Sequence, residues 1–380
     1  MNETENTQKI TLIGPVYPYT GGIAHHSALL YRALSANYRV SMISYKFLYP
    51  RFLFKRKQTD HSSDRFKIDN TNYLIHTANP FNWIRSAFRL RKDKAAAIVI
   101  QWWHPYFAPC YYLLCRLLRH SKIIFICHNI FPHERFPLDR FLTKLVLRQG
   151  DRFIVQSHQD ENDLLSLIPD AHYRLNPHPT YNAFKLTNMS RSDGRLNIGM
   201  GGDIPMLLFF GFVREYKGLK HLLAALPAIK AQIPAIQLWV VGDFAGDKAV
   251  YTQMMERLDI TDRVRIVDGY IPDEEIEQYF TAADLIVLPY ETATQSGIVQ
   301  IAYGFEKPVV VTRVGGLPDV VRDGQTGLVV EPADPAAIAQ AVIRFFTENM
   351  RDQFTEKIRE TATEFSWERM AEQISQLISD

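Results

Sequence analysis

Three side chains that carry charge or protons stand where short apolar runs of this sequence end. His128 follows the run Ile123–Cys127, and Arg214 and Lys217 follow the run Leu207–Phe210. A histidine there can hydrogen-bond a sugar hydroxyl or stabilise developing charge. Arginine and lysine together suit a diphosphate, because arginine forks around phosphate oxygens and lysine acts as a point charge. Taken singly, the histidine could instead close a strand, and the cations could be a solvated surface pair.

Two glycine-containing segments could hold an anion through backbone N–H groups. Gly21-Gly22 precedes an apolar helical pattern, without the G-x-G-x-x-G spacing of dinucleotide sites. An ordinary strand-to-helix turn remains the alternative there. In the second segment, Ser296 can cap a helix that begins at Gly297. The N–H groups of Gly297 and Ile298 are then expected to bind phosphate.

Neither a metal nor a cofactor is expected from the sequence. His128 and His133 could begin a metal site, but no third ligand follows at a suggestive spacing. The three cysteines, Cys110, Cys115 and Cys127, have neither redox nor zinc-ligand spacing. They are predicted to be reduced, mostly buried thiols of a cytoplasmic protein.

The elements that would position these residues are short strands alternating with helices. Runs of isoleucine and valine without strict alternation are typical of strands covered on both faces of a parallel sheet. In the first half they fall near Ile10–Ile13, Val40–Ile43, Ile98–Trp102, Ile123–Cys127 and Phe153–Val155. In the second half they fall near Leu207–Phe210, Leu238–Val241, Val264–Val267, Leu285–Leu288 and Val309–Val311.

This alternation over 380 residues predicts an α/β chain of two Rossmann-like, doubly wound domains that face a central cleft. The first domain is expected over residues 1–185 and the second over 206–362. Residues 186–205 are polar and glycine-rich and are predicted to be a linker. Residues 363–380 are predicted to hold a final helix that could pack on either domain, including back on the first.

Eight segments in register resemble glycosyltransferase family 4, the group 1 transferases of the GT-B fold. In chain order they are "GGIAHHSALL", "CHNIFPHER", "GFVREYKGLKHLLAAL", "VVGDF", "DGYIPDEEIEQYFTAADLIVLPY", "TQSGIVQIA", "PVVVTRVGGLPDVVRDGQTGLVV" and "FSWERMAEQI". The resemblance implies a retaining transfer from a nucleotide-sugar donor without a metal. It implies that the second domain binds the donor and the first faces the acceptor.

The resemblance also implies roles for individual residues. Gly21 and Gly22 would lie against the donor phosphate or the acceptor, and His128 would contact the transferred sugar. Arg214 and Lys217 would neutralise the departing diphosphate, which gains negative charge in an oxocarbenium-like transition state. The family usually has arginine directly after the glycine of this motif, where this chain has Phe212. The assignment of Lys217 is therefore firmer than that of Arg214.

The E-x7-E signature of the family lacks both of its acids here. Anchored on Gly297, its two positions fall on Thr294 and Ala302, while Glu291 and Glu306 stand off-register. The family's sugar and ribose contacts therefore cannot be carried over. The segment "TQSG" before an apolar helix resembles a bacterial branch of the same family, which favours a variant donor site over an inactive one.

Bulk properties and basic segments bear on the partners. A net charge of +2 does not suggest nucleic acid, the polar amino terminus is not a signal peptide, and no apolar run approaches the ~20 residues of a membrane span. Two segments do combine cations with aromatic residues. They are Tyr45–Lys57 ("YKFLYPRFLFKRK") and "NPFNWI" with Arg85, Arg89, Arg91, Lys92 and Lys94. They suit peripheral contact with an anionic membrane at the cytoplasmic face, although a solvated loop and a polar helix face would look alike.

The predicted function is a hexosyltransferase-like transfer to a lipid-linked, polysaccharide or other glycan acceptor. Two other functions stay open. One is a GT-B sugar-nucleotide epimerase or hydrolase. The other is a catalytically silent sugar- or partner-binding protein, which the residues Thr294 and Ala302 bring into consideration.

Overall fold

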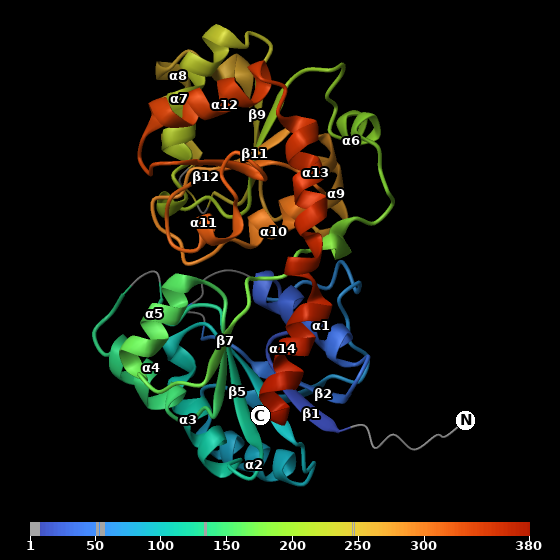
Figure 1. The fold of residues 1–380 in the computed structure, drawn as a ribbon, viewed down its shortest axis with the longest axis vertical. Helices are drawn as coiled ribbons and strands as arrows, with labels where there is room; N and C mark the ends of the chain where they lie inside the picture. The colour runs from blue at the N-terminus through green and yellow to red at the C-terminus, as the bar shows by residue number, and fades with distance from the viewer. Residues whose placement is uncertain (1–7, 51–52, 54–57, 133–134, 245, 247) are drawn as a thin grey trace. The chain divides into compact units, whose positions relative to one another are not determined.

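The computed structural model describes residues 8–50, 53, 58–132, 135–244, 246 and 248–380 (Figure 1). The chain divides into two compact units, one of Met1–Pro177 with Ser366–Asp380 and one of His178–Phe365. Each unit is built on one parallel sheet covered by helices. The prediction of two Rossmann-like α/β domains is confirmed.

The N-terminal unit has a seven-stranded sheet in the order β3-β2-β1-β4-β5-β6-β7. Its strands are β1 (Lys9–Ile13), β2 (Arg39–Phe47), β3 (Asn72–His76), β4 (Ala97–Trp102), β5 (Lys122–Cys127), β6 (Arg152–Val155) and β7 (Tyr173–Leu175). β4 and all but the first residue of β5 are buried, because helices cover both faces of the central strands. The three cysteines are buried and unpaired, as predicted.

The helices of this unit lie in two layers, one on each face of the sheet. Because strand–helix–strand connections are right-handed, the direction of each connection across the sheet decides on which face its helix lies. The connections β3–β4, β4–β5 and β5–β6 all advance in the same direction across the sheet. They place α2 (Pro80–Arg91), α3 (Ala108–Leu117) and α4 (Asp139–Leu147) on one face, and α3 contacts both of its neighbours. The connection β1–β2 runs the other way, so α1 (Gly22–Leu34) covers the opposite face. There it packs against α14 (Trp367–Ser379) (Figure 1). The remaining helix is α5 (His158–Leu167).

The C-terminal unit has a six-stranded sheet in the order β10-β9-β8-β11-β12-β13. Its strands are β8 (Met206–Phe210), β9 (Gln237–Gly242), β10 (Val264–Asp268), β11 (Leu285–Leu288), β12 (Val309–Thr312) and β13 (Gly327–Val330). Its helices are α6 (Arg191–Asn197), α7 (Leu219–Gln232), α8 (Lys248–Arg257), α9 (Asp273–Ala282), α10 (Gly297–Gly304), α11 (Leu317–Val320), α12 (Pro335–Thr347) and α13 (Arg351–Thr361). Strands β8 and β11 are neighbours, so the loops that follow them lie side by side.

Residues 186–205, which the sequence predicts to be a linker, are part of the C-terminal unit. The buried carboxylate of Glu277 accepts hydrogen bonds from the backbone N–H groups of Leu186 and Thr187, both at 3.0 Å. Helix α6 then begins at a capping box and packs on α9. The polar composition of this segment reflects ionic anchoring to the domain.

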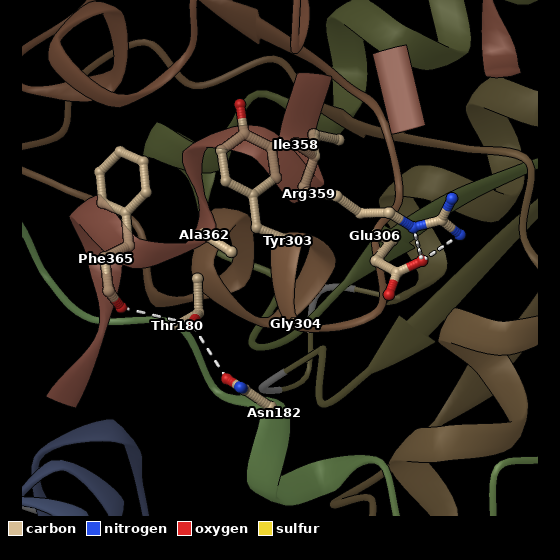
Figure 2. A pocket seen from close by; sticks show the side chains of 9 residues that line it. All are labelled: Thr180, Asn182, Tyr303, Gly304, Glu306, Ile358, Arg359, Ala362 and Phe365. Carbon is tan, nitrogen blue, oxygen red and sulfur yellow. Dashed lines mark hydrogen bonds and ion pairs between the residues drawn. The ribbon is translucent and has the colours of Figure 1, made fainter. Parts of the chain in front are cut away.

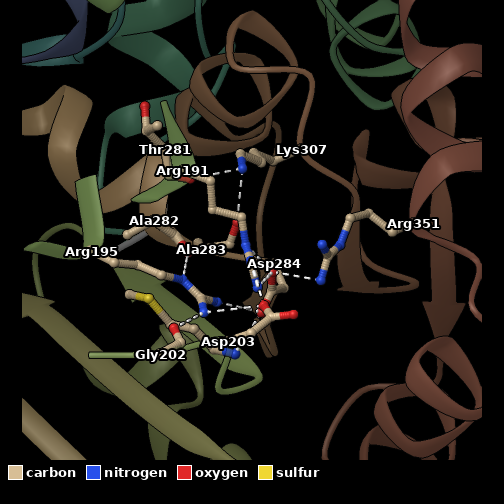
Figure 3. Close-up of polar contacts among 11 residues, drawn as sticks. Arg191, Arg195, Gly202, Asp203, Thr281, Ala282, Ala283, Asp284, Lys307 and Arg351 are labelled. Atoms are coloured by element: carbon tan, nitrogen blue, oxygen red, sulfur yellow. Dashed lines mark hydrogen bonds and ion pairs between the residues drawn. The ribbon is translucent and has the colours of Figure 1, made fainter. Parts of the chain in front are cut away.

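That anchoring centres on Asp284, which is fully buried at the start of β11 (Figure 3). Its carboxylate accepts from Arg191 at 2.9 Å and from Arg195 at 2.9 Å, both on α6. Arg351, at the start of α13, pairs with the same carboxylate at 2.7 Å. One carboxylate therefore joins two helices to the sheet. The first continuous segment of the N-terminal unit ends at Pro177, whereas the sequence predicted residue 185.

A small cavity of ≈ 160 Å³ lies where the C-terminal unit begins and ends in the chain (Figure 2). Beside it, the N–H of Thr180 donates to the carbonyl of Phe365 at 2.9 Å. The ion pair of Glu306 with Arg359, at 2.6 Å, forms part of its wall. None of the site residues predicted from the sequence lines this cavity, so the candidate site lies elsewhere.

Candidate functional site

The loops after β8 and β11 bring Lys217 and Ile298 together over Gly211. A Cβ built on Gly211 would lie 3.3 Å from the Lys217 Nζ and 3.4 Å from the Ile298 Cδ1. Gly211 has φ +100°, a backbone conformation that a side chain would strain. The sequence showed this glycine directly after the strand, in "FFGF", but did not mark it as a site residue.

Lys217 is a partly buried amine without a negative partner among the described residues. It ends the short 3-10 turn Glu215–Lys217, and its Nζ lies 5.6 Å from the centre of the Tyr290 ring. Burial and, to a smaller extent, the nearby charge of Arg214 together lower the pKa of Lys217 from 10.5 to about 8. A neighbouring lysine, Lys220, has the carboxylate of Glu291 at 2.8 Å. Lys217 is therefore a cation whose counter-charge this part of the chain does not supply.

Arg214 precedes the same turn and is exposed. The carbonyl of Arg214 accepts the N–H of Lys217 at 3.0 Å, which fixes the two residues on one turn. No carboxylate of the described residues forms an ion pair with Arg214. The structure thus places both predicted cations at the carboxyl end of β8, with Arg214 facing solvent.

Ser296 caps helix α10 as predicted, but its hydroxyl uses one of the two N–H groups assigned to phosphate. The Oγ of Ser296 accepts the N–H of Ile298 at 3.3 Å. The prediction that this N–H is left for a ligand needs correction, because the cap bonds two residues ahead. Among the described residues no acceptor contacts the N–H of Gly297, which remains available at the helix start.

Neighbouring parts of the C-terminal unit hold Thr294 and Ala302, which occupy the two signature positions where the family has acids. The carbonyl of Thr294 accepts the N–H of Gly316 at 2.7 Å. Ala302 is fully buried on the inner face of α10. Glu291 lies 2.8 Å from the Nε2 of His221, and the hydrogen bond from Lys220 holds the pKa of its carboxyl below the usual value, as does that from His221. The off-register acid Glu291 therefore fastens the loop after β11 to the start of α7.

In the N-terminal unit, Gly21 and Gly22 begin α1 after β1. Gly21 is the N-cap with φ +103° and ψ 167°, and no side chain caps the helix. A Cβ built on either glycine would meet no atom within 4 Å. The turn thus has open space beside its backbone, as an anion site at a helix start requires.

His128 follows β5 and is buried against its own sheet. Its N–H donates to the carbonyl of Trp102 at 2.8 Å, and its Nε2 lies 2.5 Å from the Oε1 of Gln101 at the end of β4. Since an amide oxygen only accepts, the Nε2–H donates, and in the neutral ring Nδ1 carries the lone pair. The ring also meets His26 edge-on at 4.6 Å. Gln101 is a positioning residue that the sequence did not reveal, because glutamine inside a buried strand resembles a core residue.

The first predicted basic–aromatic segment is partly core. Tyr45 lies in β2 and Leu48 follows it, and both are buried. Residues 51–52 and 54–57, which hold most of its cations, lie outside the described residues, as do His133 and Glu134. The second segment lies in and just after α2, where its cations are exposed and Trp83 is half-buried. No helix of the described residues is long and apolar enough to cross a membrane.

Residues 204–348 match the family model described as "Glycosyl transferases group 1". A D-inositol 3-phosphate glycosyltransferase of Corynebacterium diphtheriae is 27% identical over 251 residues, which are 63% of this chain and 58% of that protein. Another, from a Nocardioides species, is 30% identical over 243 residues, 60% of this chain and 53% of that protein. The matched parts thus span between one half and three fifths of these relatives.

Solved structures match almost the whole chain. Sucrose-phosphate synthase of Thermosynechococcus elongatus has a TM-score of 0.73 at 23% identity, covering 97% of this chain and 98% of that one. Anabaena HepE, solved in complex with UDP, has a TM-score of 0.75 at 16% identity, covering 98% and 100%. At such identities the likeness concerns the fold.

Two parallel-sheet units with these relatives define the class: the chain has the GT-B fold. Its residues 204–348 match the model of the group 1 glycosyl transferases, the family that the sequence motifs resemble.

Proposed function

We propose that this chain transfers a sugar from a nucleoside-diphosphate sugar to a glycan or lipid-linked acceptor, with retention and without a metal. The observation that carries the proposal is the pair Lys217 and Arg214. Lys217 lies against Gly211, Arg214 begins the same turn, and no carboxylate of the described residues pairs with either. A diphosphate would supply the missing negative charge and restore the pKa of Lys217.

Fixed cations can do here what a metal does in other transferases. As the sugar–phosphate bond breaks, negative charge grows on the diphosphate. Lys217 and Arg214 would stabilise that charge, together with the N–H of Gly297 at the start of α10. No proton transfer is needed at Lys217, because its ammonium acts as an electrostatic partner.

The N-terminal residues take the roles that the family resemblance implies. We assign His128 to the transferred sugar, with the ring oriented by Gln101. We assign the backbone of Gly21 and Gly22 to the donor phosphate or the acceptor. We also assign Thr294 to donor binding, through its place in the loop before α10.

The relatives guide the choice of substrates to test. Two curated relatives are named as D-inositol 3-phosphate glycosyltransferases, and HepE was solved with UDP and with UDP-glucose. We therefore propose uridine-diphosphate sugars as the first donors to test. A lipid-linked or polysaccharide acceptor would place the reaction at the cytoplasmic face of a membrane.

Thermal-shift screening against nucleotide sugars, with a chelator present, tests the proposal. A ligand that binds only the folded state stabilises it by RT ln(1 + [L]/Kd), so a true donor raises the melting temperature. We expect one nucleoside diphosphate and its sugars to do so without metal. Lys217→Met should reduce the shift, while Lys230→Met, which removes a lysine of α7 that pairs with Asp262, should preserve it. Equal shifts in both variants would contradict the assignment.

A further inference from the structure

The outer face of α2 is a ridge of apolar side chains flanked by cations. Phe81, Ile84 and Phe88 are exposed by 85%, 40% and 56%. The exposed cations of the same face and its end are Arg85, Arg89, Arg91 and Lys92. These seven residues form what we call the α2 surface.

Helical geometry makes this surface continuous. At about 100° per residue, Phe81, Ile84 and Phe88 fall within an arc of about 60°. Arg91 lies on one side of that arc, and Arg85, Arg89 and Lys92 lie on the other. The opposite face of α2, with Ser86, Ala87 and Leu90, is buried and holds the helix on its unit. The ridge therefore points away from the sheet.

The charge of this region has one sign. Helix α2 contains no acidic residue, and Asp93 just beyond it pairs with Lys9 at 3.1 Å. In the same layer the N-cap of α4, Leu138, and Phe141 in its first turn are exposed by 69% and 62%, beside the exposed Arg140. The one acid of α4, Asp139, is buried and paired with Arg135. Apolar tips and cations thus recur on two helices that flank α3.

We propose that the α2 surface binds the anionic surface of a lipid bilayer. Phe81, Ile84 and Phe88 enter the boundary between headgroups and acyl chains, where such side chains are favoured. The flanking arginines and Lys92 reach the lipid phosphates with their long side chains. An acidic protein would satisfy the cations, but it would not explain an apolar ridge that runs along the helix between them.

This inference rests on the proposed function, since a lipid-linked acceptor is presented at a membrane surface. Its test measures membrane binding and not sugar transfer, so the membrane inference and the proposed function can fail separately. A chain that releases nucleoside diphosphate without binding vesicles would leave the transferase standing and overturn the α2 surface. A chain that binds vesicles but uses no donor would do the reverse.

The experiment is flotation of the full chain with vesicles of phosphatidylcholine alone or mixed with phosphatidylglycerol. We expect the chain to float only with anionic vesicles and to be released by salt. Arg85→Gln with Arg89→Gln should weaken the partition coefficient about 25-fold, at about fivefold per cation. Phe81→Ser with Phe88→Ser should weaken it at least tenfold.

The matched control combines Val250→Ser and Arg265→Gln, which change exposed residues of the C-terminal unit and should leave flotation unchanged. Melting curves of all variants show that each is folded. Absence of flotation at low salt, or α2 variants that float like the wild type, would overturn the proposal. Soluble polyglutamate that binds as tightly as vesicles, with no effect of the phenylalanine changes, would assign the surface to an acidic polymer instead.

Discussion

Replacing Lys217 by methionine separates two effects of this unpaired amine: its destabilisation of the fold and its contribution to diphosphate binding. Burial moves the pKa of this amine from 10.5 to about 8 in the ligand-free protein. At about 1.4 kcal/mol per pKa unit the displacement corresponds to roughly 3 kcal/mol. Because the amine is still partly accessible to water, we take about 2 kcal/mol as the usable part.

The sign of the pH effect on stability follows from proton counts. Between pH 8 and 10.5 the unfolded chain holds a proton at Lys217 that the folded chain has lost, so stability rises with pH. Below pH 8 both states are protonated, and the full destabilisation applies. Lys217→Met should therefore raise the melting temperature of the ligand-free protein at pH 7 by several degrees, at about 2–4 °C per kcal/mol. The gain should vanish above pH 10.5.

Ligand binding should show the opposite effect. A bound diphosphate stabilises the protonated amine, so Lys217→Met should weaken nucleoside-diphosphate binding about 30-fold. Isothermal titration calorimetry from pH 7 to 10 measures this. The ratio of variant to wild-type Kd should shrink as the pH rises above 8, by up to tenfold per unit, since the wild type loses its charge. Lys230→Met should follow the wild type throughout. A Lys217→Met chain that binds as tightly as the wild type at pH 7, or a ratio independent of pH, would refute the reasoning.

Three further changes test other parts of the account. Gly211→Ala forces a side chain into a left-handed backbone and towards Lys217 (3.3 Å), so unfolding should become easier by about 1–2 kcal/mol and diphosphate binding should weaken; unaltered melting and binding would show that the loop adapts. Gln101→Leu removes the acceptor of the His128 Nε2–H, so the ring should sample both tautomers by ¹⁵N NMR and kcat should fall about tenfold with the donor KM unchanged; a single tautomer with normal kcat would argue against a positioning role. Asp284→Asn leaves three arginines around a neutral amide, so the free energy of unfolding should fall by about 3 kcal/mol and the melting temperature by roughly 6–12 °C. The control is Asp203→Asn, which changes an exposed partner of Arg191 and should have a small effect. An equally small effect of Asp284→Asn would contradict the anchoring of α6.

The sequence predicted the fold well because buried parallel strands leave a strong apolar signal. All ten expected strands are present. The sequence missed three others, β3, β7 and β13, for physical reasons. β3 and β7 lie at the two edges of their sheet and carry polar residues, as in Asn72–His76. β13 has four residues and begins with Gly327. Short or edge strands bury less surface, so their composition approaches that of loops.

Contacts between distant segments were harder to predict. Arg191 and Arg195 gave residues 186–205 a linker-like composition, and only the structure shows that both meet Asp284, about ninety positions later. The capping of α10 was foreseen at Ser296, but which N–H its hydroxyl takes depends on backbone dihedrals that composition does not reveal. Gln101 was invisible for a similar reason, since its role exists only through its contact with His128.

The central claim is metal-independent glycosyl transfer, and one measurement tests it most directly. Each nucleotide-sugar donor is incubated with the chain, a chelator and a membrane or glycan extract as acceptor. Two quantities are measured: the release of nucleoside diphosphate and, by NMR of the anomeric carbon, the configuration of the product. The account predicts acceptor-dependent release from one donor, with the donor's anomeric configuration kept and with a marked loss in Lys217→Met. Release without acceptor would indicate a hydrolase, and conversion of the donor to its epimer without release would indicate an epimerase. No release from any donor, or release only when a divalent metal is restored, would contradict the account.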